Sequence, residues 1–193
     1  MSMKFSSDAG AGYIRSTSGK LEMYNSSSMN AALNSSIVNA GQVLQTVSMR
    51  YDTRSTWNIP TTPTIITDMN ISITPKFATS KIFVMYMLSY EVAENNMWRL
   101  GRNGTEIVRN SLDANPWSGW GMVQYDQDNS STPYTNTYWY IDTPGTTALT
   151  TYNLMIVSSN GGAQTLYMNR TISSAGQDSY EVAVSFAMLQ EIA

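Results

Sequence analysis

The stretch that decides the fold begins Ile71-Ser72-Ile73-Thr74-Pro75 and, after a polar turn over 76–80, continues Ile82-Phe83-Val84-Met85-Tyr86-Met87-Leu88. Its first limb alternates apolar and polar residues, which is the period of a strand buried on one face only. The second limb is apolar at both parities, so this strand must be covered on both faces. We expect the core to cover one face and another copy of the chain to cover the other.

The chain after Gly41 carries the signals of a β-sandwich. A long strand is predicted over 42–51, and a polar connection over 52–64 leads to Ile65-Ile66. Asn103-Gly104 is the strongest short hairpin signal in the chain. Further strands are predicted over 134–142, 151–157, 164–169 and 179–192. A total of about eight to ten strands without a convincing helix predicts an all-β fold, and a jelly roll satisfies that count.

Two of the later strands, 151–157 and 179–192, are also apolar at both parities. Each would expose an apolar face in a monomer, which favours a homotrimer. The residues that we expect to form the core and the trimer interface are Phe83, Met85, Met87, Leu154, Ile156, Val184 and Phe186.

The first forty residues differ in composition from the rest. Residues 12–16 and 20–24 flank Ser18-Gly19 and predict a small hairpin. A short helix with a narrow apolar stripe follows, formed by Met29, Leu33 and Ile37. A single hairpin and a short helix are not stable without a partner. Residues 1–40 are therefore either a flexible arm or an attachment arm that orders on a larger assembly. We expect the attachment arm, followed by one domain over 41–193.

Composition excludes several classes of function. The chain has no Cys and no His, so disulfides, imidazole bases, Ser-His-Asp triads and the common zinc sites are ruled out, and no cofactor or metal is expected. Lys plus Arg is 11 against Asp plus Glu 14 without a run of either sign, which argues against nucleic acid. The longest apolar run is too short for membrane insertion. No signal peptide core is evident, so we expect synthesis in the cytoplasm.

Several short motifs follow one another along the chain. They are Gly41-Gln42-Val43-Leu44-Gln45, Ile71-Ser72-Ile73-Thr74-Pro75 with Ser80-Lys81-Ile82, Arg102-Asn103-Gly104-Thr105, Tyr140-Ile141-Asp142-Thr143-Pro144-Gly145 with Thr151-Tyr152, and Met188-Leu189-Gln190-Glu191-Ile192-Ala193. In this order they resemble the C-terminal domain of tailed-bacteriophage virion fibre and decoration proteins. The resemblance covers residues 41–193. It implies a tumour-necrosis-factor-like jelly roll that forms a homotrimer exposed on the virion, made in the host cytoplasm.

One candidate ligand site is rich in aromatic residues. Aromatic faces beside carboxylate and amide groups are what a sugar-binding loop uses, by stacking on rings and bonding hydroxyls. The alternative is that the tryptophans are packing residues, because large aromatic side chains are mostly buried. The candidate glycan-binding residues are Trp117, Trp120, Tyr125, Asp126 and Asp128.

Carboxylates offer the remaining chemistry. Residues 126–129 lack the glycine and the distal glutamate of the calcium loop pattern, so a solvated turn is the expected reading. Glu91, Glu94 and Asp113 are the candidates for the paired carboxylates of a polysaccharide-cleaving enzyme. We interpret them as loop charges and expect a protein without enzymatic activity.

Two functions of different classes remain open. In the first, the trimer is a fibre or knob whose loops recognise a polysaccharide of the host surface. In the second, it is a head decoration protein that attaches to the capsid and stabilises it. In both, residues 1–40 dock on another virion protein, of the tail or of the capsid.

Overall fold

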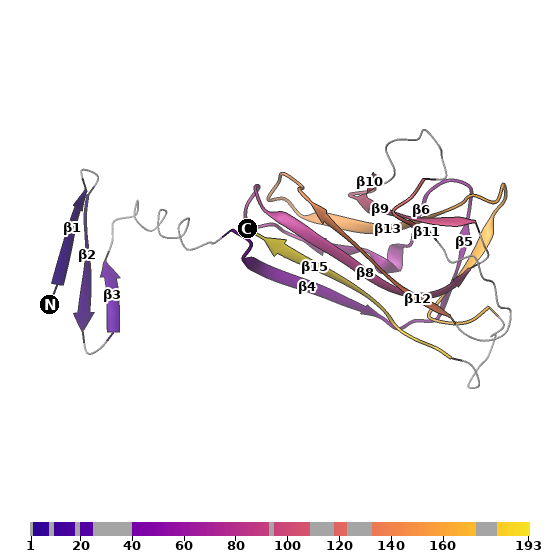
Figure 1. Ribbon diagram of the computed structural model, residues 1–193, viewed down its shortest axis with the longest axis horizontal. Helices are drawn as coiled ribbons and strands as arrows, with labels where there is room; N and C mark the ends of the chain where they lie inside the picture. The colour runs from indigo at the N-terminus through magenta and orange to yellow at the C-terminus, as the bar shows by residue number, and fades with distance from the viewer. Residues whose placement is uncertain are drawn as a thin grey trace. The chain divides into compact units, whose positions relative to one another are not determined.

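The computed structural model describes residues 40–92, 95–108, 118–122, 133–172 and 181–193 in full, together with the backbone of three strands nearer the N terminus. The chain divides into two compact units, Met1–Gln42 with Ala193 and Val43–Ile192. Figure 1 draws both of them.

The N-terminal unit contains a three-stranded antiparallel sheet. Its strands β1 (Ser2–Ser7), β2 (Gly10–Thr17) and β3 (Lys20–Tyr24) follow the order β1-β2-β3. β2 and β3 form a hairpin at the position that the sequence indicated, and β1 adds a strand that the sequence analysis did not anticipate. The predicted helix with Met29, Leu33 and Ile37 lies outside the described residues.

The larger unit is a jelly-roll β-sandwich of two antiparallel sheets, which confirms the predicted fold class. The first sheet, here called the β8 sheet, has the order β4-β15-β8-β14-β5, with β12 also paired to β8. Its strands are β4 (Val43–Tyr51), β15 (Ser185–Ile192), β8 (Lys81–Val92), β14 (Gln164–Met168), β5 (Ser55–Ile59) and β12 (Tyr134–Asp142). Figure 1 shows β15 lying between β4 and β8.

The second sheet, here called the β13 sheet, has the order β10-β9-β13-β6. In addition, β11 pairs with β9, and β7 pairs with β13. Its strands are β10 (Thr105–Val108), β9 (Asn96–Arg102), β13 (Thr150–Ser158), β6 (Thr64–Ile65), β11 (Gly121–Met122) and β7 (Ile71–Ile73). A single 3₁₀ turn, η1 (Thr67–Met69), connects β6 and β7.

Strands β5 and β15 depart from the sequence prediction, and the two-residue strand β11 was not predicted. β5 lies in the stretch expected to be a polar connection, because Trp57 and Ile59 alternate with exposed residues and Leu166 of β14 pairs with Trp57. β15 begins at Ser185 and not near 179, because residues 181–183 are exposed and form no strand. Val182 is one of these exposed residues, so the apolar pattern in the sequence begins before the strand itself does.

The core lies between the two sheets and explains the pattern of β8. Alternate residues of β8, Ile82 and Val84 among them, are completely buried. They form one cluster with Trp98 of β9 and with Leu154 and Ile156 of β13. Complete burial of each large apolar side chain is worth about 1.5–3 kcal/mol, so this inward face is the main source of stability.

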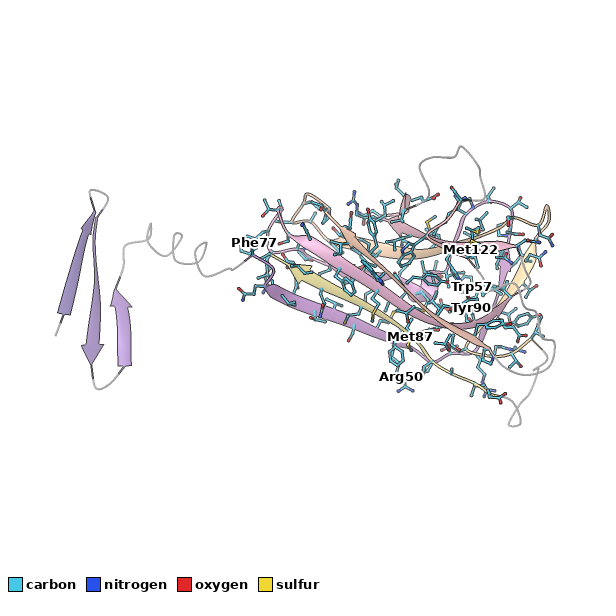
Figure 2. The ribbon with its side chains drawn as sticks, viewed as in Figure 1. Arg50, Trp57, Phe77, Met87, Tyr90 and Met122 are labelled. Carbon is cyan, nitrogen blue, oxygen red and sulfur yellow. The ribbon has the colours of Figure 1, made fainter. Side chains whose placement is uncertain are left out.

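The sandwich has two distinct ends. The proximal end contains Gln42, Phe77, the 103–104 turn and the C-terminal Ala193, whose backbone N–H donates to the Gln42 carbonyl oxygen at 3.0 Å. Figure 2 labels Phe77 at this end. The distal end contains the turns after β8 and β13, where Ser159 donates its backbone N–H to Asn95 at 2.7 Å.

Candidate functional site

The outer surface of the β8 sheet carries an apolar patch. On β8, three residues alternate with the buried core residues and are half-buried. The strand register places apolar residues of β12 and β15 directly beside them. This set, called the outer apolar face, consists of Phe83, Met85, Met87, Trp139, Ile141, Phe186 and Met188.

Several members of the outer apolar face are largely accessible to water. Trp139 is 61% exposed, Ile141 45% and Phe186 36%. The Trp139 ring stacks on Phe83 with the centroids 6.2 Å apart and the planes inclined by 27°. A contiguous apolar surface of this kind marks an interaction site in soluble proteins, because single apolar residues are otherwise scattered.

Polar residues of β4 border the outer apolar face. The register places Arg50 beside Phe186, Ser48 beside Met188, and Thr46 beside Gln190. All three β4 residues are exposed, and Arg50 pairs with Asp52 at 3.3 Å. Figure 2 shows Arg50 projecting away from the sandwich. An apolar centre with a polar border is the usual arrangement of a protein–protein interface.

The predicted core and interface residues separate into two groups. Phe83, Met85, Met87 and Phe186 belong to the outer apolar face, whereas Leu154 and Ile156 are completely buried in the core. Val184 is half-buried just before β15 begins. The predicted set lacks Trp139, Ile141 and Met188, although the alternation within 134–142 places the first two on one face.

β13 is apolar at both parities, yet it needs no second copy of the chain. The residues opposite to its core side are also buried, since Met155 is 6% exposed and Val157 1%. On the same face, the Arg99 guanidinium pairs with Glu106 at 2.7 Å. Gly101 leaves room there for Met155, because a Cβ at Gly101 would lie 2.7 Å from the Met155 sulfur. This strand therefore gives no argument for a trimer.

Trp120 is the one glycan candidate among the described residues. Its ring is half-buried and packs against Tyr86 and Tyr138, with centroid separations of 6.1 and 5.5 Å. Its indole Nε1 donates to the carbonyl oxygen of Trp139 at 3.1 Å, and its backbone N–H donates to Trp98 at 2.7 Å. Trp120 thus joins the edges of the two sheets. Trp117, Tyr125, Asp126 and Asp128 lie outside the described residues.

Two glycines make this seam between the sheets possible. A Cβ at Gly121 would lie 2.0 Å from the Tyr138 ring, and a Cβ at Gly119 would lie 2.7 Å from the Trp98 carbonyl oxygen. The Tyr138 hydroxyl donates to the carbonyl oxygen of Met122 at 3.0 Å, and burial raises its pKa. The glycines that flank Trp120 are therefore required for close packing.

The candidate carboxylates show no catalytic arrangement in the part of the chain that is described. Glu91 is buried, and one of its oxygens accepts the backbone N–H of Ile172. Glu94 and Asp113 lie outside the described residues. Among those that are described, no group of three His, Cys, Asp or Glu residues could hold a metal ion.

Two buried carboxylates organise the proximal end. Glu191 accepts hydrogen bonds from the backbone N–H of Lys76 at 2.7 Å, from Phe77 at 3.2 Å, and from the Gln45 amide at 2.6 Å. Burial alone would raise its pKa, but these hydrogen bonds to the charged form leave the pKa of Glu191 lowered. Glu191 therefore fixes the turn between β7 and β8.

Asp142 is the second carboxylate. It accepts hydrogen bonds from the Tyr152 hydroxyl at 2.7 Å and from the Arg102 guanidinium at 2.8 Å. Burial and the Asp142 charge raise the pKa of the Tyr152 hydroxyl, which keeps it a proton donor. The pair ties β12 to β9 and β13 across the sandwich.

Comparisons with known proteins identify no family. No family model matches the chain, and no curated protein matches it. One solved structure, titled "Structure of infectious bursal disease virus Gx strain", contains a chain that matches with a TM-score of 0.36 and 8% identity. The match covers 98% of this chain, which spans about 50% of the viral chain. This likeness is too weak to indicate a function.

No helix among the described residues is long and apolar enough to cross a membrane.

Proposed function

We propose that this protein is a virion structural protein of a tailed bacteriophage, in which three jelly rolls associate through the outer apolar face into an exposed knob. The observation that carries the proposal is the outer apolar face itself. Phe83, Met85 and Met87 run along the middle of the β8 sheet. Each has an apolar neighbour on β12 or β15, and Met85 has one on both strands. Covering them with two further copies removes this surface from water.

The trimer is tested by light scattering on the purified protein, with Met85→Glu as the disrupting variant. Met85 is in the centre of the face, so a carboxylate there would be buried without a partner. The control is Thr165→Glu, an exposed residue of β14 on the same sheet and away from the face. We expect a trimer for the parent chain and for the control, and a monomer with an intact circular dichroism spectrum for Met85→Glu. A monomeric parent chain would contradict the proposal.

The second part of the proposal is that residues 1–40 attach the knob to another virion protein. The register of the N-terminal sheet supports it, because Met3, Ile14 and Met23 form one cross-strand row. Apolar positions grouped in this way are typical of segments that bind another protein. We expect a chain lacking residues 1–27 to remain a soluble trimer that is not incorporated into virions. Normal incorporation would show that the arm is not the anchor.

The third part concerns the host. We propose that the distal end faces the host surface and contributes to recognition of a surface polysaccharide. The support is that Gln42, where the chain enters the domain, lies at the proximal end, whereas the turns after β8 and β13 lie at the opposite end. Three weak sites per trimer would give avidity gains of about 10²–10⁴. Trp117→Ala and Tyr125→Ala should reduce virion adsorption while the trimer persists.

Head decoration is the alternative role, and one observation favours it. Trp120 packs in the seam between the sheets. One of the two tryptophans that we expected to bind sugar is therefore a packing residue. Unchanged adsorption by both variants would leave decoration as the better reading. Labelling of virions with antibody against this protein separates the two roles directly, because it shows tail or head.

We also propose that the protein has no enzymatic activity. The support is that the chain contains no His or Cys and that Glu91 is buried. One oxygen of the Glu91 carboxylate accepts a hydrogen bond from the backbone N–H of Ile172. Polysaccharide cleavage that Glu91→Gln or Asp113→Asn abolishes, while the trimer remains intact, would overturn this part.

A further inference from the structure

The chain contains two Asn-Gly pairs, Asn103-Gly104 and Asn160-Gly161, and the structure treats them differently. Asn-Gly is the dipeptide most open to succinimide formation, because glycine has no Cβ to hinder attack by its backbone nitrogen on the asparagine side chain. Both pairs are exposed turns, and both glycines have positive φ, 80° at Gly104 and 72° at Gly161. Exposure and the conformation of the two glycines therefore do not distinguish the pairs, but the asparagines differ, because Asn103 has a positive φ of 51° and Asn160 does not.

Hydrogen bonds hold the proximal pair in place. The Asn103 side-chain oxygen accepts the backbone N–H of Thr151 at 2.8 Å. The backbone N–H of Gly104 donates to the Asn153 side-chain oxygen at 2.8 Å. Asn153 is itself buried and donates to Asn70 at 2.9 Å. Both groups that must react are thus engaged, and the turn would have to break two short hydrogen bonds before its nitrogen could reach the side-chain carbon.

The distal pair is held weakly. The Asn160 side-chain oxygen accepts one bond, from the Asn95 amide, at 3.3 Å and exposed to water. This separation is longer than the usual 2.7–3.2 Å of N–H···O bonds. Within the described part of the chain, the N–H of Gly161 donates no hydrogen bond. A Cβ placed at Gly161 or at Gly104 would meet no atom within 4 Å, so the hydrogen bonds, and not the space around the glycines, separate the two turns.

We propose that Asn160-Gly161 is a site of spontaneous deamidation, and that Asn103-Gly104 is protected from it by the fold. In this reaction the backbone nitrogen of Gly161, after losing its proton, attacks Cγ of Asn160. The bond from Cγ to the side-chain nitrogen breaks, ammonia leaves, and a succinimide ring remains. Water then opens the ring on either side and yields aspartate or isoaspartate. No oxidant, reductant or enzyme is needed.

The reaction would change the distal end in two ways. Each event adds one negative charge to a chain that already has a formal net charge of −3. The isoaspartate product also inserts a methylene into the main chain of the turn between β13 and β14. That turn contacts the one after β8, because the Ser159 hydroxyl donates to the Asn95 carbonyl oxygen at 2.6 Å. Ageing would therefore alter the charge and shape of this end while the core stays unchanged.

The experiment follows both pairs in one sample. The full-length protein is incubated in warm, mildly alkaline buffer, and peptide mass spectrometry measures the modified fraction at each asparagine over time. We expect residue 160 to be modified at least several-fold faster than residue 103, with isoaspartate present at 160. Equal rates, or faster reaction at residue 103, would overturn the proposal.

Two controls show whether the fold causes the difference. In concentrated urea both pairs lose their tertiary contacts, so the two rates should become similar. A large difference that persists in urea would mean that local sequence, and not the hydrogen bonds, protects Asn103. The variant Asn160→Gln should abolish the acidic species that appears on ion exchange, because the longer side chain closes a less favourable ring. An unchanged acidic species would place the reaction elsewhere.

Discussion

β8 and β13 look alike in sequence, because each is apolar at both parities along its central part, but their outer faces differ. The outer face of β13 is buried by the chain itself, with Met155 and Val157 covered and Arg99 paired with Glu106. The outer face of β8 is covered only in part, and its neighbours Trp139 and Phe186 remain exposed. A strand that is apolar at both parities therefore indicates that both of its faces are covered. The sequence does not say whether the second face is covered by the same chain or by another copy.

The largest effect is expected from breaking the ion pair on the covered face. Glu106→Ala leaves the Arg99 guanidinium, whose side chain is 4% exposed, without its carboxylate. Removing one partner of a buried pair costs about 3–5 kcal/mol. Asp52→Ala, which breaks the exposed pair with Arg50, should cost about 0–1 kcal/mol. Urea denaturation measures the free energy of unfolding of both variants. Similar losses of stability for the two variants would contradict the expected difference between the buried and the exposed ion pair.

A core substitution compares the two strands directly. Leu154→Ala on β13 removes a completely buried side chain and should lower the free energy of unfolding by about 2–5 kcal/mol. Met85→Ala on the outer face of β8 should cost less within one chain and should instead weaken association. Denaturation at several protein concentrations separates the two effects. A concentration-independent loss for Met85→Ala would place that side chain in the core of the single chain.

The seam between the sheets gives a smaller effect. Gly121→Ala places a Cβ 2.0 Å from the Tyr138 ring, and the resulting displacement should cost about 1–3 kcal/mol. Gly162→Ala is the matched control, because a Cβ there meets nothing within 4 Å and its φ is not positive. Thermal unfolding followed by tryptophan fluorescence should separate the two variants. Equal unfolding temperatures would show that the seam does not contribute to stability.

The smallest effect depends on pH. The pKa of Glu191 is lower in the folded chain than in the unfolded one, so its contribution is fully present above the ordinary glutamate pKa of about 4.3. This contribution is lost as the pH falls through the folded pKa, because the neutral carboxyl group is a weaker acceptor for Lys76, Phe77 and Gln45 than the carboxylate. Glu191→Gln should reduce the acid sensitivity of unfolding. An unchanged pH profile for Glu191→Gln would show that other carboxylates account for it.

The sequence by itself determined the fold class, most strands of the domain and the outer residues of β8. Alternation at 71–74 and the continuous apolar run at 82–88 are enough for this, because strand period and burial are read from neighbouring residues. It also excluded imidazole and thiolate chemistry through composition alone.

The tertiary structure alone decided what covers each face. Gly101 and Met155, or Gly121 and Tyr138, are far apart in the chain, and only folding brings them together. The same holds for the two Asn-Gly turns, whose local sequence is alike but whose hydrogen bonds come from Thr151 and Asn153 in one case and from Asn95 in the other. Contacts between distant segments depend on register and topology, which local periodicity does not encode.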